Sequence, residues 1–307
     1  MNPLPYIDAA ELDRLVSLDD AIAALEAMFK ANETEVPQRN HVSTGAGDLL
    51  LMPATGASAT GVKLVTVNPE NPGRDLPLIH GLYVLFSGET LAPVCLIDGA
   101  ALTALRTPAV SAVATRHLAR ADATNLIIFG SGTQAQGHLH AMMGVREISS
   151  VVVVSPSGGA ALVEHARELG LDAAAGTPEL VAEADIVCTC TTSDEPVFEG
   201  ELLSPGTHVN AIGAYKPRSR ELDDDAIGDA LIVVENRQAA IAEAGDLLMP
   251  LRAGVIVEED IVAELHEVVA GKEVRAVEED ITVFKSVGLA SEDLAVAAAA
   301  CAALEAG

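Results

Sequence analysis

The chain has only 18 lysines and arginines among 307 residues, and three of them, Arg39, Lys63 and Arg106, are candidates for chemistry. Lys63 stands between Val62 and Leu64 in a run that predicts a strand. A buried cation is costly unless a counter-charge meets it. Either each of the three residues pairs with a carboxylate inside the fold, or together they form an anion pocket. The spacing alone leaves both interpretations open.

In the second interpretation the three side chains divide the work. Two guanidinium groups can clamp a substrate carboxylate. A lysine whose pKa is lowered by burial and by neighbouring cations can exchange a proton with a substrate nitrogen. Arg39 and Arg106 are therefore predicted to hold a small carboxylate, and Lys63 is predicted to handle a proton.

A glycine-rich turn forms a second candidate site. It follows an apolar run, residues 126–129, precedes a predicted helix, and consists of Gly130, Ser131, Gly132, Thr133, Gln134 and Ala135. In this G-x-G-x-x-A pattern the first glycine permits the tight turn and the second lets a pyrophosphate approach the backbone. The helix amino terminus offers unpaired N–H groups to the anion. The turn predicts a dinucleotide cofactor.

The residue at the end of the second strand of such a domain determines which of the two nicotinamide cofactors binds. In NAD-binding domains it is an acidic residue that binds the ribose 2′-hydroxyl. Ser155 stands at that position. The surrounding stretch, residues 154–158, has no carboxylate to repel a 2′-phosphate, and it also lacks an arginine to bind one. We therefore expect NADP(H) to be favoured over NAD(H).

The excess of acidic residues excludes one class of partner. The 45 aspartates and glutamates give a net charge of −27, which repels a polyphosphate backbone, so no nucleic-acid partner is expected. The chain has five lysines and no tryptophan. This composition is typical of proteins that stay soluble in concentrated salt, and it predicts a halophilic source. An ordinary acidic mesophilic enzyme is the alternative.

The remaining sequence signals indicate a cytoplasmic protein without a metal. The four cysteines fit neither a disulfide framework nor a zinc site, which implies a reducing compartment. No export signal and no apolar stretch of ~18 residues is present, so no membrane association is expected. His138 and His140 stand two apart in a predicted helix and do not share a face, so we expect no metal site.

The pattern of elements predicts two domains. A helix that starts at Ser17 precedes short strands that include residues 61–67 and 81–86, and a long helix spans about 99–120. From Asn125 onward, apolar runs alternate with helices, as in a doubly wound parallel sheet. The predicted strands are 126–129, 151–154, 186–189, 208–212 and 231–234. Residues 281–303 predict a last helix that packs back on the first domain.

Four runs, taken in chain order, resemble the ornithine cyclodeaminase/μ-crystallin family. They are residues 61–69, residues 98–107, the glycine turn 130–135, and residues 284–290. The resemblance implies an α/β fold in which a doubly wound Rossmann dinucleotide domain, residues 119–285, is inserted in an α+β domain. That second domain, residues 1–118 plus 286–307, would bind substrate and form a homodimer.

The family's roles carry over to matching positions. Arg39, Lys63 and Arg106 match the residues that bind the substrate carboxylate and handle the proton, and Asn68 and Thr107 look like supporting polar residues of the substrate site. Two further segments resemble those near the nicotinamide ring. They comprise Thr191, Thr192, Ser193, Ser286, Val287 and Gly288.

One departure from the family pattern bears on activity. Members that cyclise ornithine carry an aspartate that acts on the substrate's amino groups, and Tyr215 stands at the matching position. A phenol with a pKa near ~10 does not replace a carboxylate base at neutral pH. The leading prediction is therefore an NAD(P)H-dependent reductase of cyclic imino acids such as Δ1-pyrroline-2-carboxylate or Δ1-piperideine-2-carboxylate. Alanine dehydrogenase, ornithine cyclodeaminase and a low-turnover, cofactor-dependent binding protein are the alternatives.

Overall fold

A computed structural model of the chain describes residues 4–306. The chain divides by its packing into two compact units: unit 1, residues 1–110 and 289–307, and unit 2, residues 111–288. The domain boundaries predicted from the sequence, 118/119 and 285/286, coincide with the ends of α3 (Gly99–Leu118) and of β14 (Thr282–Lys285). The unit borders instead lie within α3 and after the turn that follows β14.

Unit 1 is built on a six-stranded sheet with the order β1-β6-β5-β4-β3-β2. Neighbouring strands run antiparallel, except that β1 and β6 are parallel. The strands are β1 (Tyr6–Ile7), β2 (Asn40–Thr44), β3 (Gly47–Thr55), β4 (Ala59–Val67), β5 (Ile79–Ser87) and β6 (Pro93–Asp98). A short 3-10 helix, η1 (Asn71–Arg74), lies between β4 and β5.

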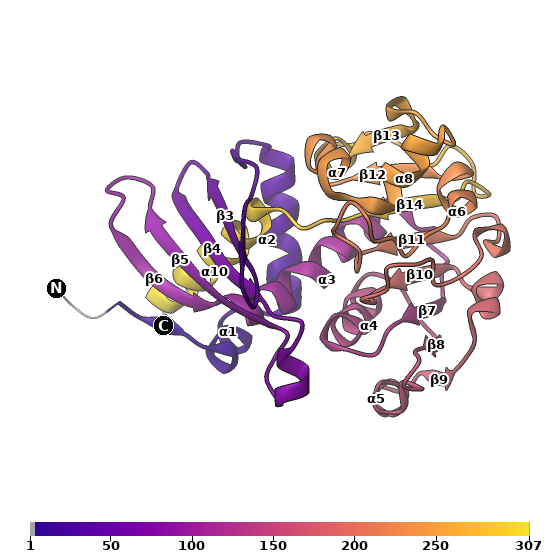
Figure 1. Ribbon diagram of the computed structural model, residues 1–307, viewed down its shortest axis with the longest axis horizontal. Helices are drawn as coiled ribbons and strands as arrows, with labels where there is room; N and C mark the ends of the chain where they lie inside the picture. The colour runs from indigo at the N-terminus through magenta and orange to yellow at the C-terminus, as the bar shows by residue number, and fades with distance from the viewer. Residues whose placement is uncertain (1–3, 307) are drawn as a thin grey trace. The chain divides into compact units, whose positions relative to one another are not determined.

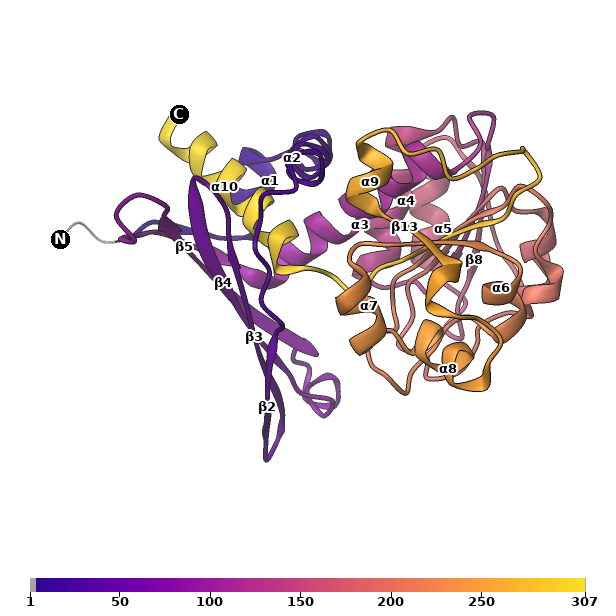
Figure 2. The ribbon, with the colours of Figure 1, turned by 90° about the horizontal axis from the view of Figure 1, so that it is seen from above.

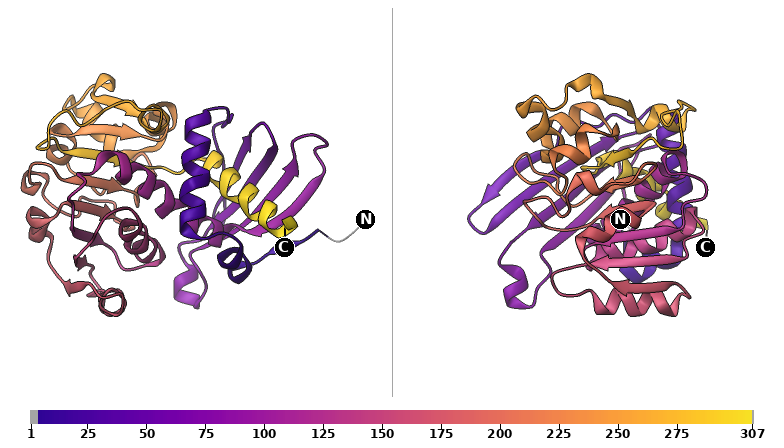
Figure 3. Two further views of the ribbon diagram at one scale, coloured as in Figure 1. Left: turned by 180° about the vertical axis from the view of Figure 1, so that it is seen from behind. Right: turned by 90° about the vertical axis from the view of Figure 1, so that its right-hand side faces the viewer.

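Helices cover one face of this sheet. They are α1 (Ala9–Leu15), α2 (Leu18–Ala31) and α10 (Ala290–Ala306), which lie on the same side of the strands (Figures 2 and 3). The predicted start of α2 is confirmed, because the Ser17 hydroxyl accepts a hydrogen bond from the Asp20 amide and the Asp20 carboxylate accepts one from the Ser17 amide. Alternate residues of β4 are buried toward the helices, and Lys63 is among them.

The prediction for the last segment is partly wrong. Residues 281–303 were expected to be one helix, whereas Thr282–Lys285 form β14 and the helix α10 begins only at Ala290. Gly288, at φ 76°, lies in the turn between them. A short buried apolar run looks alike as strand and as helix, so its periodicity could not separate the two. The expected return of the last helix onto the first domain is confirmed, since α10 packs on α2, β3 and β4.

Unit 2 is a parallel sheet with the order β13-β12-β14-β11-β10-β7-β8-β9, and Figure 1 shows the strands stacked in this order. The direction of strand addition reverses between β7 and β10, which is the topological switch point of a doubly wound sheet. The strands are β7 (Asn125–Phe129), β8 (Ser150–Val154), β9 (Asp172–Ala175), β10 (Ile186–Thr189), β11 (His208–Ala211), β12 (Leu231–Val234), β13 (Ile261–Glu264) and β14.

All five strands predicted for this unit are present, within a residue or two of their expected ends. Three further strands were not predicted: β9, β13 and β14. β9 reads Asp-Ala-Ala-Ala and β13 reads Ile-Val-Ala-Glu. Alanine and aspartate have low strand propensity, so sheet pairing rather than local sequence makes the edge strand β9, whereas β13 contains Ile261 and Val262, which favour a strand, and is only four residues long. The parallel sheet expected from the sequence is therefore larger than predicted.

Helices cover both faces of the unit 2 sheet: α6, α7 and α8 lie on one side and α4 on the other (Figure 2). The helices of unit 2 are α4 (Thr133–Val145), α5 (Ala160–Glu168), α6 (Asp224–Gly228), α7 (Arg237–Glu243), α8 (Gly245–Ala253) and α9 (Leu265–Val269). Short 3-10 helices occur at η2 (Pro178–Glu183), η3 (Gly200–Leu202) and η4 (Glu258–Asp260). Burial on both faces explains the continuous apolar strands.

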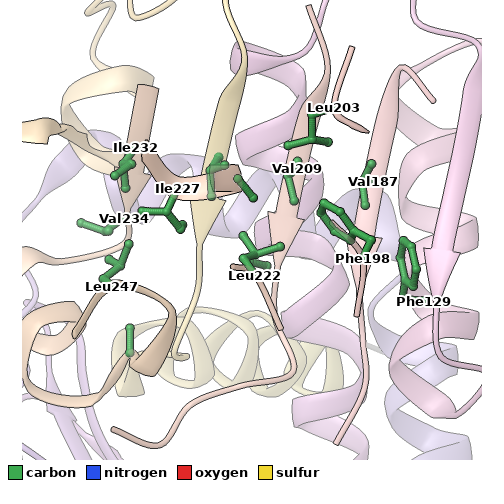
Figure 4. Close-up of a cluster of buried hydrophobic side chains, with 14 of the residues drawn as sticks. Phe129, Val187, Phe198, Leu203, Val209, Leu222, Ile227, Ile232, Val234 and Leu247 are labelled. Carbon is green, nitrogen blue, oxygen red and sulfur yellow. The ribbon is translucent and has the colours of Figure 1, made fainter. Parts of the chain in front are cut away.

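An apolar core holds the sheet of unit 2 against α6, α7 and α8 (Figure 4). Phe129 of β7 packs on Phe198, with ring centroids 5.3 Å apart. Ile227 of α6 and Leu247 of α8 lie in the same cluster. This core closes one face of the sheet with apolar side chains.

All four cysteines are free, and Cys95, Cys188 and Cys301 are buried as small apolar side chains, as expected. Cys190 is partly exposed and lies just beyond β10 rather than within it. No helix of residues 4–306 combines the length and the apolar character that a membrane span requires.

Candidate functional site

In unit 1, four charged side chains form one buried cluster, which joins β4, α3 and the first turn of α10. Lys63 Nζ donates to Asp293 at 2.8 Å and to the Thr103 hydroxyl at 3.1 Å. Arg106 donates from Nη1 to Glu292 at 2.8 Å, and its Nε lies 3.3 Å from Asp293. Both carboxylates are fully buried, and the two cations are at most 6% exposed. The structure thus brings Lys63 and Arg106 together and pairs both with carboxylates.

The cluster changes how readily Lys63 keeps its proton. Burial lowers the pKa of Lys63 to about 8, with further lowering by the charges of Arg106 and Arg39. The carboxylate of Asp293 opposes this and supports the ammonium form. The direction agrees with the sequence-based expectation of a lysine whose proton is labile near neutral pH. The structure adds the Asp293 carboxylate, which limits the lowering of the Lys63 pKa.

The other substrate-site candidates lie at varying distances from this cluster. Arg39 directly precedes β2, is partly exposed, and is close enough to influence the pKa of Lys63. Thr107 follows Arg106 on α3, and its buried hydroxyl has no hydrogen-bond partner within the described chain. Asn68 lies beyond the end of β4, five residues and therefore ~16 Å along the strand from Lys63. Its side chain accepts from the Glu70 amide, which is a turn contact.

Sequence reasoning missed the two carboxylates of α10, Glu292 and Asp293. The sequence could have indicated them, because they are an acidic pair in the first turn of a helix that otherwise consists mostly of alanine and other apolar residues. It also missed Tyr83, the cross-strand neighbour of Lys63 on β5. The Tyr83 ring is buried over Gly61, where a side chain would collide with its hydroxyl, and burial raises the pKa of the phenol.

In unit 2 the glycine turn connects β7 to α4 at the switch point of the sheet. Gly130 has φ 109°, and a Cβ there would lie 2.5 Å from the Cys190 carbonyl oxygen, so only glycine fits. Gly132 is the N-cap of α4, and open space lies where its Cβ would project. Ser131, Thr133 and Gln134 complete the turn around the amino end of this helix, and the fully buried Ala135 allows close packing. These features fit a dinucleotide pyrophosphate.

Three serines join this turn to the end of the second strand. The Ser155 hydroxyl, just after β8, lies 3.1 Å from that of Ser131 and 3.0 Å from that of Ser157. Ser131 and Ser157 are 3.3 Å apart. The group contains hydroxyls and no charge, so this end of the second strand has neither the carboxylate that binds a 2′-hydroxyl nor a cation that binds a 2′-phosphate.

The two segments expected near the nicotinamide are each held by a buried glutamate. Thr191 donates from its amide and its hydroxyl to Glu221, both at 2.7 Å, and Thr192 and Ser193 continue this loop after β10. Ser286 donates through its hydroxyl to Glu235. Val287 and Gly288 donate to the same carboxylate through their amides, at 2.9 and 3.0 Å. Both segments lie at the carboxyl edge of the sheet, where ligands bind in doubly wound domains.

The two histidines of α4 each contact another polar group. His138 is fully buried and bonds to the Gln134 carbonyl and the Ser111 hydroxyl, while His140 lies 2.9 Å from His165. Residues 4–306 contain no group of three or more side chains that could hold a metal ion.

Tyr215 packs against the apolar core of unit 2, and the ammonium of Lys216 lies 5.6 Å from its ring centroid.

Known proteins resemble this chain over nearly its whole length. A Δ1-pyrroline-2-carboxylate reductase of Bacillus cereus (strain ZK / E33L) is 40% identical over 306 residues, which cover 95% of this chain and 94% of the relative. The solved Δ1-pyrroline-2-carboxylate reductase of Thermococcus litoralis, in complex with NADH and L-proline, is 34% identical with a TM-score of 0.95. That match covers 99% of this chain and 98% of the other.

An archaeal alanine dehydrogenase, solved as a dimer with bound NAD, is 33% identical with a TM-score of 0.94. That match covers 99% of this chain and 96% of the dehydrogenase chain. The family model described as "Ornithine cyclodeaminase/mu-crystallin family" matches residues 7–305. The predicted α/β fold with a Rossmann-type parallel sheet is thereby confirmed. The chain belongs to the ornithine cyclodeaminase/mu-crystallin family.

Proposed function

We propose that this protein is an NAD(P)H-dependent reductase of cyclic imino acids of the Δ1-pyrroline-2-carboxylate or Δ1-piperideine-2-carboxylate type. One observation carries the proposal: a buried lysine with a pKa near 8 lies beside an arginine within the unit 1 cluster. Reduction of a carbon–nitrogen double bond needs an anion site for the carboxylate and a proton for the nitrogen. The similarity to two Δ1-pyrroline-2-carboxylate reductases supports the same reaction.

Each residue of the cluster then has a distinct task. Arg106 and Arg39 bind the substrate carboxylate, and Arg106 is held for this by Glu292 and Asp293. Lys63 donates a proton to the imine nitrogen, and Asp293 keeps its ammonium charged until it does so. Thr107, with its buried unpaired hydroxyl, offers a further hydrogen bond to substrate. A bound nicotinamide cofactor supplies the hydride.

The residues of unit 2 fit that cofactor. Gly132 and the amino end of α4 would hold the pyrophosphate, and the loops at Thr191 and Ser286 would receive the nicotinamide half. We propose that NADPH binds at least as tightly as NADH, because Ser155 replaces the acidic residue that selects a free 2′-hydroxyl. Titration with both cofactors tests this, and NADH binding about tenfold tighter, ~1.4 kcal/mol, contradicts it.

We also propose a homodimer formed through unit 1. Residues of β4 that point away from the helices, such as Val62 and Leu64, are apolar and only partly buried. A sheet face of this kind gains stability when a second copy covers it. The similarity to an alanine dehydrogenase solved as a dimer supports the same assembly here.

Alanine dehydrogenation is the second candidate, because the same clamp and proton donor serve an amino acid in the reverse direction, and an alanine dehydrogenase is 33% identical. A cofactor-oxidation panel separates the candidates. Δ1-pyrroline-2-carboxylate, pyruvate with ammonia, and ornithine are compared in molar KCl, since a net charge of −27 predicts salt-dependent folding. We expect the cyclic imine to be the best substrate. Turnover of pyruvate with ammonia alone would instead establish the dehydrogenase.

A further inference from the structure

Glu221 is a fully buried carboxylate that no step of the proposed reaction uses. It accepts hydrogen bonds from the hydroxyl of Thr189 at 2.8 Å, from the amide and hydroxyl of Thr191 at 2.7 Å each, and from the amides of Gly213 and Ala214 at 2.6 and 3.3 Å. Three amides and two hydroxyls thus converge on one carboxylate. This inward set of donors suits the charged form, because a protonated carboxyl would oppose one donor with another.

The donors come from the two loops at the carboxyl ends of β10 and β11. The loops also touch directly, since a Cβ on Gly213 would lie 2.1 Å from the Thr191 carbonyl oxygen. On its other side, the β10 loop meets the glycine turn, because a Cβ on Gly130 would lie 2.5 Å from the Cys190 carbonyl oxygen. The β10 loop is therefore fixed between the pyrophosphate turn and the β11 turn, and Glu221 joins it to the latter.

A second buried carboxylate fixes Glu221 itself. Asp246, in the first turn of α8, accepts from the amides of Glu221 and Leu222 at 2.7 and 3.0 Å. Asp246 also pairs with Lys285 at 2.9 Å. The Lys285 ammonium donates to the carbonyl oxygens of Ala211 and Ala214. The β11 turn is therefore held through its amides by Glu221 and through its carbonyls by Lys285. Burial raises the pKa of Glu221, and the charge of Lys285 and the bonds from Thr191 oppose that rise.

We propose that Glu221 is a positioning residue for the nicotinamide half of the cofactor, and that it acts by setting the shape of the β10 and β11 loops. In a doubly wound sheet one mononucleotide half lies over the strands on each side of the switch point, and β10 and β11 are on the side opposite β8. The adenosine half therefore meets Ser131 and Ser155, and the nicotinamide half meets the loops that Glu221 holds. The proposal rests on the proposed function, since it assumes a bound dinucleotide.

The test compares two ligands that differ in the nicotinamide. Calorimetric titration of Glu221→Gln with NADH and with ADP-ribose measures the two halves separately. The carboxamide turns an N–H donor toward the amide of Thr191 or of Gly213, and the loop must shift. We expect the Kd for NADH to rise about tenfold or more and the Kd for ADP-ribose to change less than about twofold. Equal weakening of both ligands, or of neither, would overturn the proposal.

Asp185→Asn is the matched control. Asp185 also accepts two backbone amides, those of Thr124 and Asn125 at 3.0 and 2.9 Å, but it precedes β10 and so lies at the opposite edge of the sheet. This variant should lose thermal stability and keep the wild-type ratio of the two Kd values. If Asp185→Asn changes that ratio as much as Glu221→Gln does, Glu221 contributes general stability and the proposal is wrong.

A milder variant covers the case in which Glu221→Gln does not fold. Thr189→Val removes one hydroxyl donor to Glu221 while the bonds from Thr191 remain, and it should weaken NADH selectively but less strongly. An unchanged ratio in Thr189→Val then counts against the proposal. If the wild-type protein binds none of NADH, NADPH and ADP-ribose, the dinucleotide function itself fails. Failure of the Glu221 proposal alone looks different, because the wild-type protein then binds NADH and ADP-ribose while the variants show no selectivity.

Discussion

The two units each bury a lysine almost completely, and the partners of these lysines differ. Lys285 of unit 2 pairs with the Asp246 carboxylate and donates hydrogen bonds to two backbone carbonyls. Within residues 4–306, the hydrogen bonds of Lys63 go to two side chains of unit 1, Asp293 and Thr103, and a second cation lies nearby. The contacts of Lys285 tie the end of β14 to the β11 turn and to α8, whereas Lys63 lies beside a second cation whose charge lowers its pKa. Burial alone therefore does not identify a catalytic lysine.

The largest expected effect is the loss of stability in Lys285→Met. The substitution leaves Asp246 buried without its counter-charge, which typically costs ~3–5 kcal/mol. Urea unfolding measures the change in the free energy of unfolding. Lys272→Met is the control, because Lys272 also binds a carboxylate and a backbone carbonyl, those of Glu267 and Val262, but at the surface, where an ion pair contributes less than ~1 kcal/mol. Similar losses in the two variants would remove the distinction drawn for Lys285.

Lys63→Met leaves Asp293 beside its second cation, Arg106, so we expect its main effect to be on catalysis. We expect kcat to fall ~10²-fold or more, the usual scale of lost acid–base catalysis, with the Kd for the dinucleotide unchanged. Steady-state kinetics and cofactor titration measure the two quantities. A folded Lys63→Met enzyme with near-wild-type kcat would show that the proton comes from another group, and Lys63 would then be a structural partner of Asp293.

Arg106→Lys is expected to have a smaller effect, and mainly on KM. The ammonium keeps the charge but cannot make the two-pronged contact with a carboxylate, so KM should rise about tenfold while kcat changes less. Because Arg106 also binds Glu292 and Asp293, the thermal midpoint is measured beside the kinetics. A large fall in kcat with an unchanged KM would place Arg106 in the chemical step rather than in carboxylate binding.

Much of the fold could be predicted because its signals are local. The cap at Ser17, the apolar runs that become β7, β8 and β10, and the turn at Gly130 depend on neighbours in sequence. The edge strand β9 was missed because it depends on pairing with β8, and β13 was missed because it is only four residues long. The strand β14 was missed because a short buried apolar run looks alike as strand and as helix.

The sequence predicted the cationic residues of the candidate site but not the carboxylates that pair with them. Lys63 and Arg106 were conspicuous because basic residues are scarce in this chain. Asp293 was not conspicuous, since it is one of 45 acidic residues and lies 230 positions from Lys63 in the sequence. Asn68 was placed in the substrate site by resemblance, and its side chain accepts a hydrogen bond from the Glu70 amide, which is a turn contact. Pairing between distant segments is the part that a single sequence does not reveal.

The central claim, that Lys63 supplies the proton for reduction of the carbon–nitrogen bond, is tested most directly by the pH dependence of kcat/KM. A donor with a pKa of about 8 is charged below that pH and loses its proton above it, so reduction of Δ1-pyrroline-2-carboxylate should slow as pH rises through about 8. In Lys63→Met, a residual rate without this descending limb is predicted. The same limb in both proteins would contradict the claim.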